Sequence, residues 1–228
     1  MVDSILFFGR KNCKYSDNLK KFLKKKTKNL FYIESDKSKK KLNTKALLKK
    51  NYSYIICFRS FYILKKNLIN KAKITAINFH PGTPKYRGSG CINYAMYNNE
   101  RYYGSTCHLI NEKIDSGQIL DFKIFEIKKK DTLKDVLKKT HLSMLKQSKL
   151  ILGKLFEDKE NLKFFLMKNR KIKWSKKYNT LKKLDKFYEI KTNCNKKEIE
   201  LKIKATNINN YKPYIYLHKK KFILSDGL

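Results

Sequence analysis

The chain has 228 residues, 41% of them hydrophobic, which is enough for one domain with a buried core and a small appendage. Its 55 Lys and Arg residues against 19 Asp and Glu give a formal net charge of +36, which predicts an anionic partner. No apolar run reaches the length of a transmembrane helix, which argues against an integral membrane protein.

The positive charge has two interpretations, a nucleic-acid-binding surface or compositional drift. Only five of the 55 basic residues are arginine, and the chain is also rich in the Asn, Ile, Tyr and Phe residues that AT-rich codons encode. Nucleic-acid sites favour the bidentate guanidinium of arginine. We therefore expect drift to supply most of the charge and any nucleic-acid binding to be non-specific.

The five cysteines show neither a Cys-x-x-Cys pair nor the spacing of zinc ligands. Their odd number, in a sequence without a signal-peptide pattern, predicts reduced thiols, a cytoplasmic location and no metal site. Cys13 could be a nucleophile, but a small buried hydrophobic side chain is the favoured interpretation.

The first part of the chain alternates apolar, β-branched runs with amphipathic stretches. We expect strands at 5–9, 30–33, 54–58 and 74–77, and helices at 16–26, near 46–48 within a charged connector (36–50), and at 63–70. This alternation predicts an α/β fold, with a Rossmann-like, mostly parallel sheet and flanking helices. The turn at 9–12 has a single glycine and so lacks the dinucleotide-binding fingerprint.

The second part predicts a helix at 93–100, a strand at 103–110, and a long helix from a cap at Asp131-Thr132 to Leu155, followed by a loop at 158–162. A short helix is expected at 180–184 and strands at 198–203, 214–217 and 221–224, the last two forming a hairpin around Lys219-Lys220. We therefore expect a main domain over residues 1–172 and a small α+β appendage over 173–228. The apolar strands of this appendage predict packing on the main domain or on a second subunit, as a homodimer.

Polar side chains follow the expected strand at 74–77. Asn78 and His80 are two residues apart, so they share a face of the strand, and Pro81 ends it. The carboxyl ends of strands are where open α/β sheets place their chemistry. Asp115, elsewhere in the sequence, could orient the imidazole and raise its basicity. Taken singly, His80 could be an ordinary loop histidine, Asn78 a turn residue, and Asp115 a helix or turn cap.

Four motifs occur in order around these residues: Asn78-Phe79-His80-Pro81, Tyr86-Arg87-Gly88, a Gly-x-Thr-x-His run at 104–108 and an Asp-x-Gly-x-Ile run at 115–119. With these motifs, residues 74–120 resemble the catalytic core of the folate-dependent formyltransferases. The variant loop at 80–91, His-Pro-Gly-Thr-Pro followed by Gly-Ser-Gly-Cys, is most similar to the nucleotide-sugar N-formyltransferases.

The resemblance implies transfer of a formyl group from 10-formyltetrahydrofolate to the amine of a sugar linked to a nucleotide diphosphate. It implies that Asn78 donates its amide to the oxyanion. His80 polarises the formyl carbonyl and moves the proton, and Asp115 fixes the imidazole. It also makes residues 1–172 the catalytic domain.

The resemblance further implies a folate pocket with two walls, formed by Phe58, Arg59 and Ser60 on one side and by Ile110 and Asn111 on the other. The contacts of the first wall are largely main-chain, and the aromatic side chains there are also candidates for the core.

On the substrate side the resemblance points to Tyr86, Arg87 and His108. Arg87 could instead brace its loop, and His108 could be a hydrogen-bonded core histidine. His141 and His218 lie outside the motifs, and we expect both at the surface.

Two other functions remain open. One is formyl transfer to another amine, including methionyl-tRNA, although the region after Trp174 is shorter than the barrel domain of methionyl-tRNA formyltransferases. The other is a basic RNA-binding protein on an inactive formyltransferase fold, against which the intact Asn78, His80 and Asp115 speak.

Overall fold

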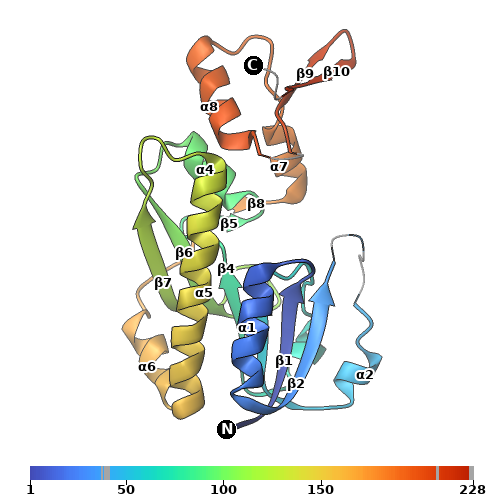
Figure 1. Ribbon diagram of the computed structural model, residues 1–228, viewed down its shortest axis with the longest axis vertical. Helices are drawn as coiled ribbons and strands as arrows, with labels where there is room; N and C mark the ends of the chain where they lie inside the picture. Colours follow the sequence, from blue (N-terminus) through green and yellow to red (C-terminus); the bar gives the residue numbers. More distant parts are fainter. Residues whose placement is uncertain (37, 39–41, 209–210, 226–228) are drawn as a thin grey trace.

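A six-stranded sheet forms the centre of the molecule, with strand order β2-β1-β3-β4-β6-β7 (Figure 1). The computed structural model describes residues 1–36, 38, 42–208 and 211–225. The strands of the sheet are β1 (Val2–Arg10), β2 (Thr27–Ser35), β3 (Tyr52–Phe58), β4 (Ala72–His80), β6 (Tyr102–Leu109) and β7 (Ile119–Glu126). Of the charged connector expected at 36–50, residues 37 and 39–41 lie outside the described residues.

The sheet is mixed. Strands β2, β1, β3 and β4 pair in parallel, whereas β6 and β7 are antiparallel additions beside β4. The expected Rossmann-like α/β fold is therefore confirmed. Strand β7 was missed because its sequence, Ile-Leu-Asp-Phe-Lys-Ile-Phe-Glu, mixes apolar and charged residues without a regular alternation, as a strand at the sheet edge can.

The parallel strands are apolar on both faces because helices cover both sides. On β1, Ile5 and Phe7 face one core cluster, and Leu6 and Phe8 face the other. The first cluster is covered by α1 (Lys14–Lys24), α5 (Leu133–Glu157) and α6 (Asn161–Lys168), of which α1 and α5 lie in front of the sheet in Figure 1. The second is covered by the short helices α2 (Lys45–Leu48) and α3 (Lys66–Ile69).

Helix α5 begins where the sequence predicts. Thr132 accepts a hydrogen bond from the Asp135 main chain, and the Asp135 carboxylate accepts one from the Thr132 main chain, which completes a capping box. The helix runs to Glu157, and α6 starts at Asn161, inside the expected loop at 158–162. The loop is therefore shorter than predicted.

Beyond α6 the chain crosses back to the other end of the sheet. The strands β5 (Arg87–Gly88) and β8 (Tyr178–Asn179) pair in parallel and bring the segment after residue 172 against the motif loops. The helices α7 (Leu181–Phe187) and α8 (Lys196–Thr206) follow, and α8 contacts α4 (Cys91–Tyr97), which precedes β6 in the chain. The hairpin of β9 (Tyr214–Leu217) and β10 (Lys220–Ile223) lies furthest from the sheet (Figure 1).

The expected strand at 198–203 is wrong, because this segment is part of helix α8. Asn195 accepts from the Glu198 main chain and the Glu198 carboxylate accepts from the Asn195 main chain, so a capping box starts the helix. Asn93 of α4 donates to the Ala205 carbonyl at 2.7 Å, which fixes the other end. The hairpin is confirmed, but its turn is His218-Lys219, one residue earlier than expected, with φ of 48° and 64°.

Strand register brings the polar motif residues together. Asn78 on β4 lies directly opposite His108 on the antiparallel strand β6, and His80 lies opposite Thr106. On the far side of β6, the register with β7 shifts between Cys107 and His108. Such a bulge re-aims side chains and is common next to active sites.

No helix within the described ranges is both long enough and apolar enough to cross a bilayer.

The expectation that His141 lies at the surface is wrong. Its side chain is buried on α5, with its ring 5.2 Å from that of Tyr15 on α1. Burial, together with the charges of Arg59 and Arg10, lowers the pKa of His141 to about 3. The histidine was misjudged because it belongs to the helix face that packs on α1, which only the docking of the two helices determines.

We expect this burial to make the protein sensitive to acid. An unfolded chain protonates His141 near pH 6.5 and the folded chain only near pH 3. The stability contributed is complete above pH 6.5 and is lost as the pH falls toward 3. His141→Gln should therefore reduce the slope of unfolding free energy against pH by up to about 1.4 kcal/mol per pH unit. Urea titrations between pH 7 and 4 measure it.

The control is His218→Asn, which changes an exposed histidine in the hairpin turn. It should leave the slope unchanged. Equal slopes for wild type and His141→Gln would contradict the assignment.

Candidate active site

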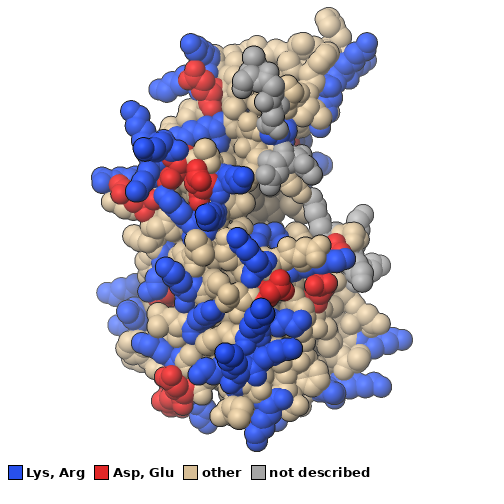
Figure 2. Space-filling model, viewed as in Figure 1, with Lys and Arg blue, Asp and Glu red and all other residues tan. Residues whose placement is uncertain are grey.

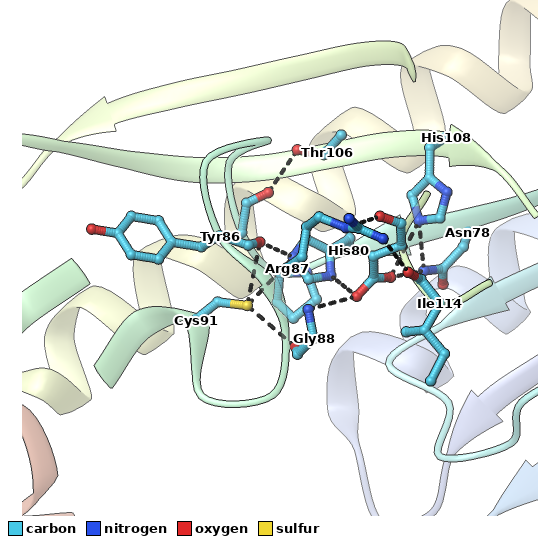
Figure 3. A network of polar contacts seen from close by, with 12 residues as sticks. Asn78, His80, Tyr86, Arg87, Gly88, Cys91, Thr106, His108 and Ile114 are labelled. Carbon is cyan, nitrogen blue, oxygen red and sulfur yellow. Dashed lines mark hydrogen bonds and ion pairs between the residues drawn. The ribbon is translucent and has the colours of Figure 1, made fainter. Parts of the chain in front are cut away.

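The polar cluster lies where β4 ends. Asn78 and His80 share the face of β4 that also carries Ala76, as expected, and Pro81 follows the last strand residue. Asn78, His80 and His108 lie together in Figure 3. Each of the three side chains comes within 3.3 to 3.5 Å of the Asp115 carboxylate. The three expected catalytic residues are therefore in one place, with only Asn78 partly exposed.

His80 is held between two acceptors. Its Nδ1 lies 3.3 Å from Asp115 Oδ2, and its Nε2 donates to the Tyr86 carbonyl at 2.9 Å. Only the imidazolium can donate to both. Burial alone would lower the pKa of His80, but the charge of Asp115, with a smaller contribution from Cys91, raises it well above its usual range.

Asp115 adopts a left-handed backbone conformation, with φ of 45°. The Arg87 guanidinium maintains this turn by donating to the carbonyls of Asp115, at 2.6 Å, and Ile114, at 3.0 Å. The Gly88 main chain donates to Asp115 Oδ2 at 3.0 Å. Burial would raise the pKa of Asp115, but His80 and the hydrogen bond from His108 outweigh it and hold the pKa well below its usual range.

His108 links β6 to the cluster. Its Nδ1 donates to its neighbour's carbonyl, that of Leu109, at 2.8 Å, and its Nε2 lies 3.0 Å from Asn78 Nδ2. The same ring nitrogen lies 3.5 Å from Asp115 Oδ1. The Asn78 amide also donates to Asp115 Oδ1 at 3.5 Å, which is long for a hydrogen bond. A ligand oxygen beside Asn78 would replace that weak contact first.

The side chains of Tyr86 and Arg87, both expected on the substrate side, make their hydrogen bonds to groups in the surrounding loops. The Tyr86 ring is buried and points away from His80 (Figure 3). Its hydroxyl donates to Glu100 at 2.7 Å and accepts from Asn98. Arg87 braces the loops through carbonyl oxygens, the alternative that the sequence left open, although no carboxylate takes part in these bonds.

The residues expected around a folate lie on either side of Asn78. Cys57, the residue before Phe58, pairs with Asn78 across β3 and β4, and Ile110 donates to the Ala76 carbonyl of β4. The Phe58 side chain belongs to the core, so only its main chain is available to a ligand. The remaining members of the two walls are partly or fully exposed, namely Arg59, Ser60, Ile110 and Asn111.

A basic pocket of about 300 Å³ opens at the ends of β1 and β2, on the same edge of the sheet. It is lined by Arg10, Lys11, Asn12, Ser35, Asp36 and Phe61. The Arg10 guanidinium lies 4.1 Å above the Phe61 ring, and Arg10 Nε donates to the Arg59 carbonyl. Burial and the neighbouring Arg59 lower the pKa of Arg10 to about 10. This clustering of cations at a strand end favours an anionic ligand.

Cys13 lies behind this pocket. It is buried, as the favoured interpretation holds, but its sulfur accepts a hydrogen bond from Arg59 Nη1 at 3.0 Å. Burial would raise the pKa of the Cys13 thiol, but the hydrogen bond from Ser16 and the charge of Arg59 lower it.

Two residues in contact with the histidines were missed. Trp174 packs edge-on against His80 and His108, with ring-centroid distances of 5.5 and 5.0 Å. Cys91 Sγ lies 3.6 Å from His80 Nε2 and contacts the Tyr86 and Gly88 carbonyls. Trp174 is the sole tryptophan in the chain, which marks it as unusual, but it lies 94 residues after His80 and no motif joins them.

Known proteins similar to this chain carry the same fold. A family model described as formyl transferase matches residues 7–147, more than half of the chain. The bifunctional polymyxin resistance protein ArnA of Wigglesworthia glossinidia brevipalpis is 32% identical over 126 residues, which are 55% of this chain and 19% of that protein. The methionyl-tRNA formyltransferase of Clostridium tetani is 35% identical over 82 residues, 34% of this chain and 26% of that protein. The matches thus span about a quarter or less of these curated relatives.

Solved structures match over nearly the whole chain. A 4-N formyltransferase from Francisella tularensis has a TM-score of 0.75 at 21% identity, covering 98% of this chain and 96% of that one. The N-formyltransferase of Helicobacter canadensis, in complex with folinic acid and dTDP-3-aminofucose, has a TM-score of 0.69 at 18% identity, covering 96% and 85%. At these identities the likeness concerns the fold, and the family model decides membership: the chain belongs to the formyl transferase family.

Proposed function

We propose that this protein transfers a formyl group from 10-formyltetrahydrofolate to the amine of a nucleotide-linked amino sugar. The observation that carries the proposal is the buried cluster of Asn78, His80 and Asp115 at the carboxyl end of β4. It combines an amide donor, a cationic imidazole and a carboxylate, the groups that acyl transfer to an amine requires.

Each residue of the cluster has a distinct role in this proposal. The bound donor supplies the formyl carbonyl. Asn78, the exposed member, donates its weakly engaged amide hydrogen to the carbonyl oxygen. The His80 imidazolium stabilises negative charge on that oxygen, exchanging the Tyr86 carbonyl for the reacting group. As the bond from the formyl carbon to the acceptor nitrogen forms and the bond to the folate nitrogen breaks, His80 gives its proton to the leaving folate nitrogen and regains one from the acceptor amine. Asp115 holds the imidazole and its charge in place.

The loops beside Asn78 fit the flat, polar edge of a pterin. Strand β3 ends at Phe58 and β6 ends at Leu109, so the main-chain groups of 59–60 and 110–111 lie beyond the ends of these strands. The Helicobacter canadensis structure, in complex with folinic acid, supports a folate in this fold.

The basic pocket supports an anionic acceptor. It lies at the ends of β1 and β2, on the edge of the sheet where β4 ends at His80. Arg10 suits a pyrophosphate, whereas Lys11 is already paired with Asp36 at 3.0 Å. The Phe61 ring is exposed, and the face that the Arg10 guanidinium does not cover offers a stacking surface for a base. A nucleoside diphosphate sugar combines these features, and a free amino sugar does not.

Methionyl-tRNA as acceptor, or RNA binding by an inactive fold, is the competing function. Figure 2 shows Lys and Arg scattered over the visible face, interrupted by acidic groups, without a continuous basic stripe. In fold, the Helicobacter canadensis N-formyltransferase, in complex with dTDP-3-aminofucose, matches 96% of this chain. In sequence, the methionyl-tRNA formyltransferases of Clostridium tetani and Nitratiruptor match 34% and 59% of it. The scattered charge and the extent of the fold match favour the sugar.

We also propose a homodimer formed through the β9–β10 hairpin. Tyr216, Leu217, Phe222 and Ile223 are all exposed there, on a two-stranded sheet too small to bury them. The strand register places Leu217 and Phe222 on one face of the hairpin and Tyr216 and Ile223 on the other, and a second copy of the hairpin would cover one of these faces.

The first prediction concerns His80. His80→Asn should keep the fold and lower turnover by about a hundredfold or more, the scale of losing an acid–base group. Steady-state kinetics with purified protein measures this, and circular dichroism verifies the fold. His218→Asn, a change at an exposed histidine, should be neutral. Near-normal turnover of folded His80→Asn would remove His80 from the mechanism.

The second prediction concerns the acceptor. Nucleotide-linked amino sugars, free amino sugars and methionyl-tRNA are each incubated with 10-formyltetrahydrofolate at physiological salt, and the products are read by mass. Only a nucleotide-linked sugar should be formylated. Arg10→Ala should raise its KM about tenfold, the scale of losing a charged hydrogen bond.

The matched control is Arg101→Ala, which removes the same charge from an exposed residue paired with Glu126. An equal KM change in both variants would assign the effect to net charge rather than to the pocket. Salt-resistant formylation of methionyl-tRNA would overturn the sugar assignment.

The third prediction concerns assembly. Light scattering should give a dimer for the wild type. The double variant Leu217→Ser, Phe222→Ser, which changes neighbouring exposed positions of the hairpin, should be a monomer. A wild-type monomer would contradict the dimer.

A further inference from the structure

Trp174 joins the parts of the polar cluster that come from different segments. Its indole meets the His80 ring at an interplanar angle of 81° and the His108 ring at 88°. Its Nε1 donates to the Gly117 carbonyl at 2.7 Å, two residues beyond Asp115. One side chain thus contacts the end of β4, the end of β6 and the turn that carries the carboxylate.

The residue that follows makes the same connection through its main chain. The Ser175 nitrogen donates to the Pro84 carbonyl at 2.9 Å, and the Ser175 carbonyl accepts from Arg87 Nη1 at 3.1 Å. Arg87 in turn donates to the Asp115 carbonyl. Residues 174 and 175 therefore clamp the loop of the Tyr-Arg-Gly motif to the Asp115 turn.

The cluster requires such a clamp for two physical reasons. Asp115 has a left-handed backbone conformation that a non-glycine residue rarely adopts alone, so surrounding contacts must maintain it. The attraction between Asp115 and His80 also depends on a low local dielectric, which water would raise. The apolar indole of Trp174 packs against both imidazoles, so it holds the rings in place and excludes water from the ion pair.

We propose that Trp174 is a positioning residue of the active site: it fixes the ring planes of His80 and His108 around Asp115 and keeps water from the carboxylate. Its kinetic consequence rests on the proposed formyl transfer, whereas its effect on the histidines does not. The role belongs to a residue outside the four motifs, in the segment that leads into β8.

The first test needs no substrate. The groups that face the His80 ring are Asp115 of the turn and Cys91 at the start of α4. Beyond Asp115 lie His108 of β6, beside the other carboxylate oxygen, and Arg87 of β5, which donates to the main-chain carbonyl of Asp115. Burial and these charges together leave the pKa of His80 raised. Water entering the cluster moves any pKa back toward its ordinary value, which here means downward.

The pKa of His80 is measured by nuclear magnetic resonance of the imidazole protons in the wild type, in Trp174→Ala and in Trp174→Phe. The His80→Asn variant identifies the signal of His80. We expect the pKa of His80 to fall in Trp174→Ala and to stay near the wild-type value in Trp174→Phe, which keeps an aromatic ring. An unchanged pKa in folded Trp174→Ala would overturn the proposal, whatever reaction the protein performs.

The second test is kinetic. In Trp174→Ala, kcat should fall about tenfold to a hundredfold, the scale of misplaced catalytic groups, while the KM of the acceptor changes little. Trp174→Phe should recover most of the activity. Leu181→Ala, which truncates an exposed apolar residue of α7 in the same part of the chain, is the matched control and should be neutral.

Equal losses of kcat in Trp174→Ala and Leu181→Ala would indicate general loosening and overturn the proposal. Absence of any formyl transfer by the wild type would refute the proposed function and leave the resonance test to decide the role of Trp174.

Discussion

The ion pair between Asp115 and His80 is the interaction on which the site depends. Both groups are buried, and a buried charge is costly unless it is paired and hydrogen-bonded. Asp115 receives the His80 ring on one oxygen and, more distantly, Asn78 and His108 on the other. The pair therefore sets the protonation state of the imidazole and the positions of its neighbours.

Holding that pair requires segments that are distant in the sequence. Arg87 ties the Asp115 turn to the loop after β4, and Gly88 donates to the carboxylate from the same loop. Gly88 has φ of 83°, and a side chain there would collide with the Asn179 carbonyl of β8. The segment after residue 172, expected to begin an appendage, thus contributes Trp174 and the strand β8 to the site.

The lysines and the arginines of this chain occupy different places in the molecule. At the surface, lysines are scattered over the visible face (Figure 2), as compositional drift predicts. The arginines are few, and three of the five lie at the edge of the sheet where the site forms: Arg10, Arg59 and Arg87. A guanidinium can be partly buried while bonding several carbonyls, which an ammonium does less well.

The sequence by itself determined the alternating α/β core and the shared face of Asn78 and His80, which follow from strand periodicity. The association of both with Asp115 was expected from the resemblance of the four motifs to a known family. Prediction from sequence failed at 198–203, where a capping box outweighed an alternation of charged and apolar residues, and at His141, whose burial depends on how α5 docks on α1. Only the tertiary structure decided that Tyr86 turns away from the site and that Trp174 covers its histidines. Contacts between residues so far apart arise from packing, which no local pattern of side chains encodes.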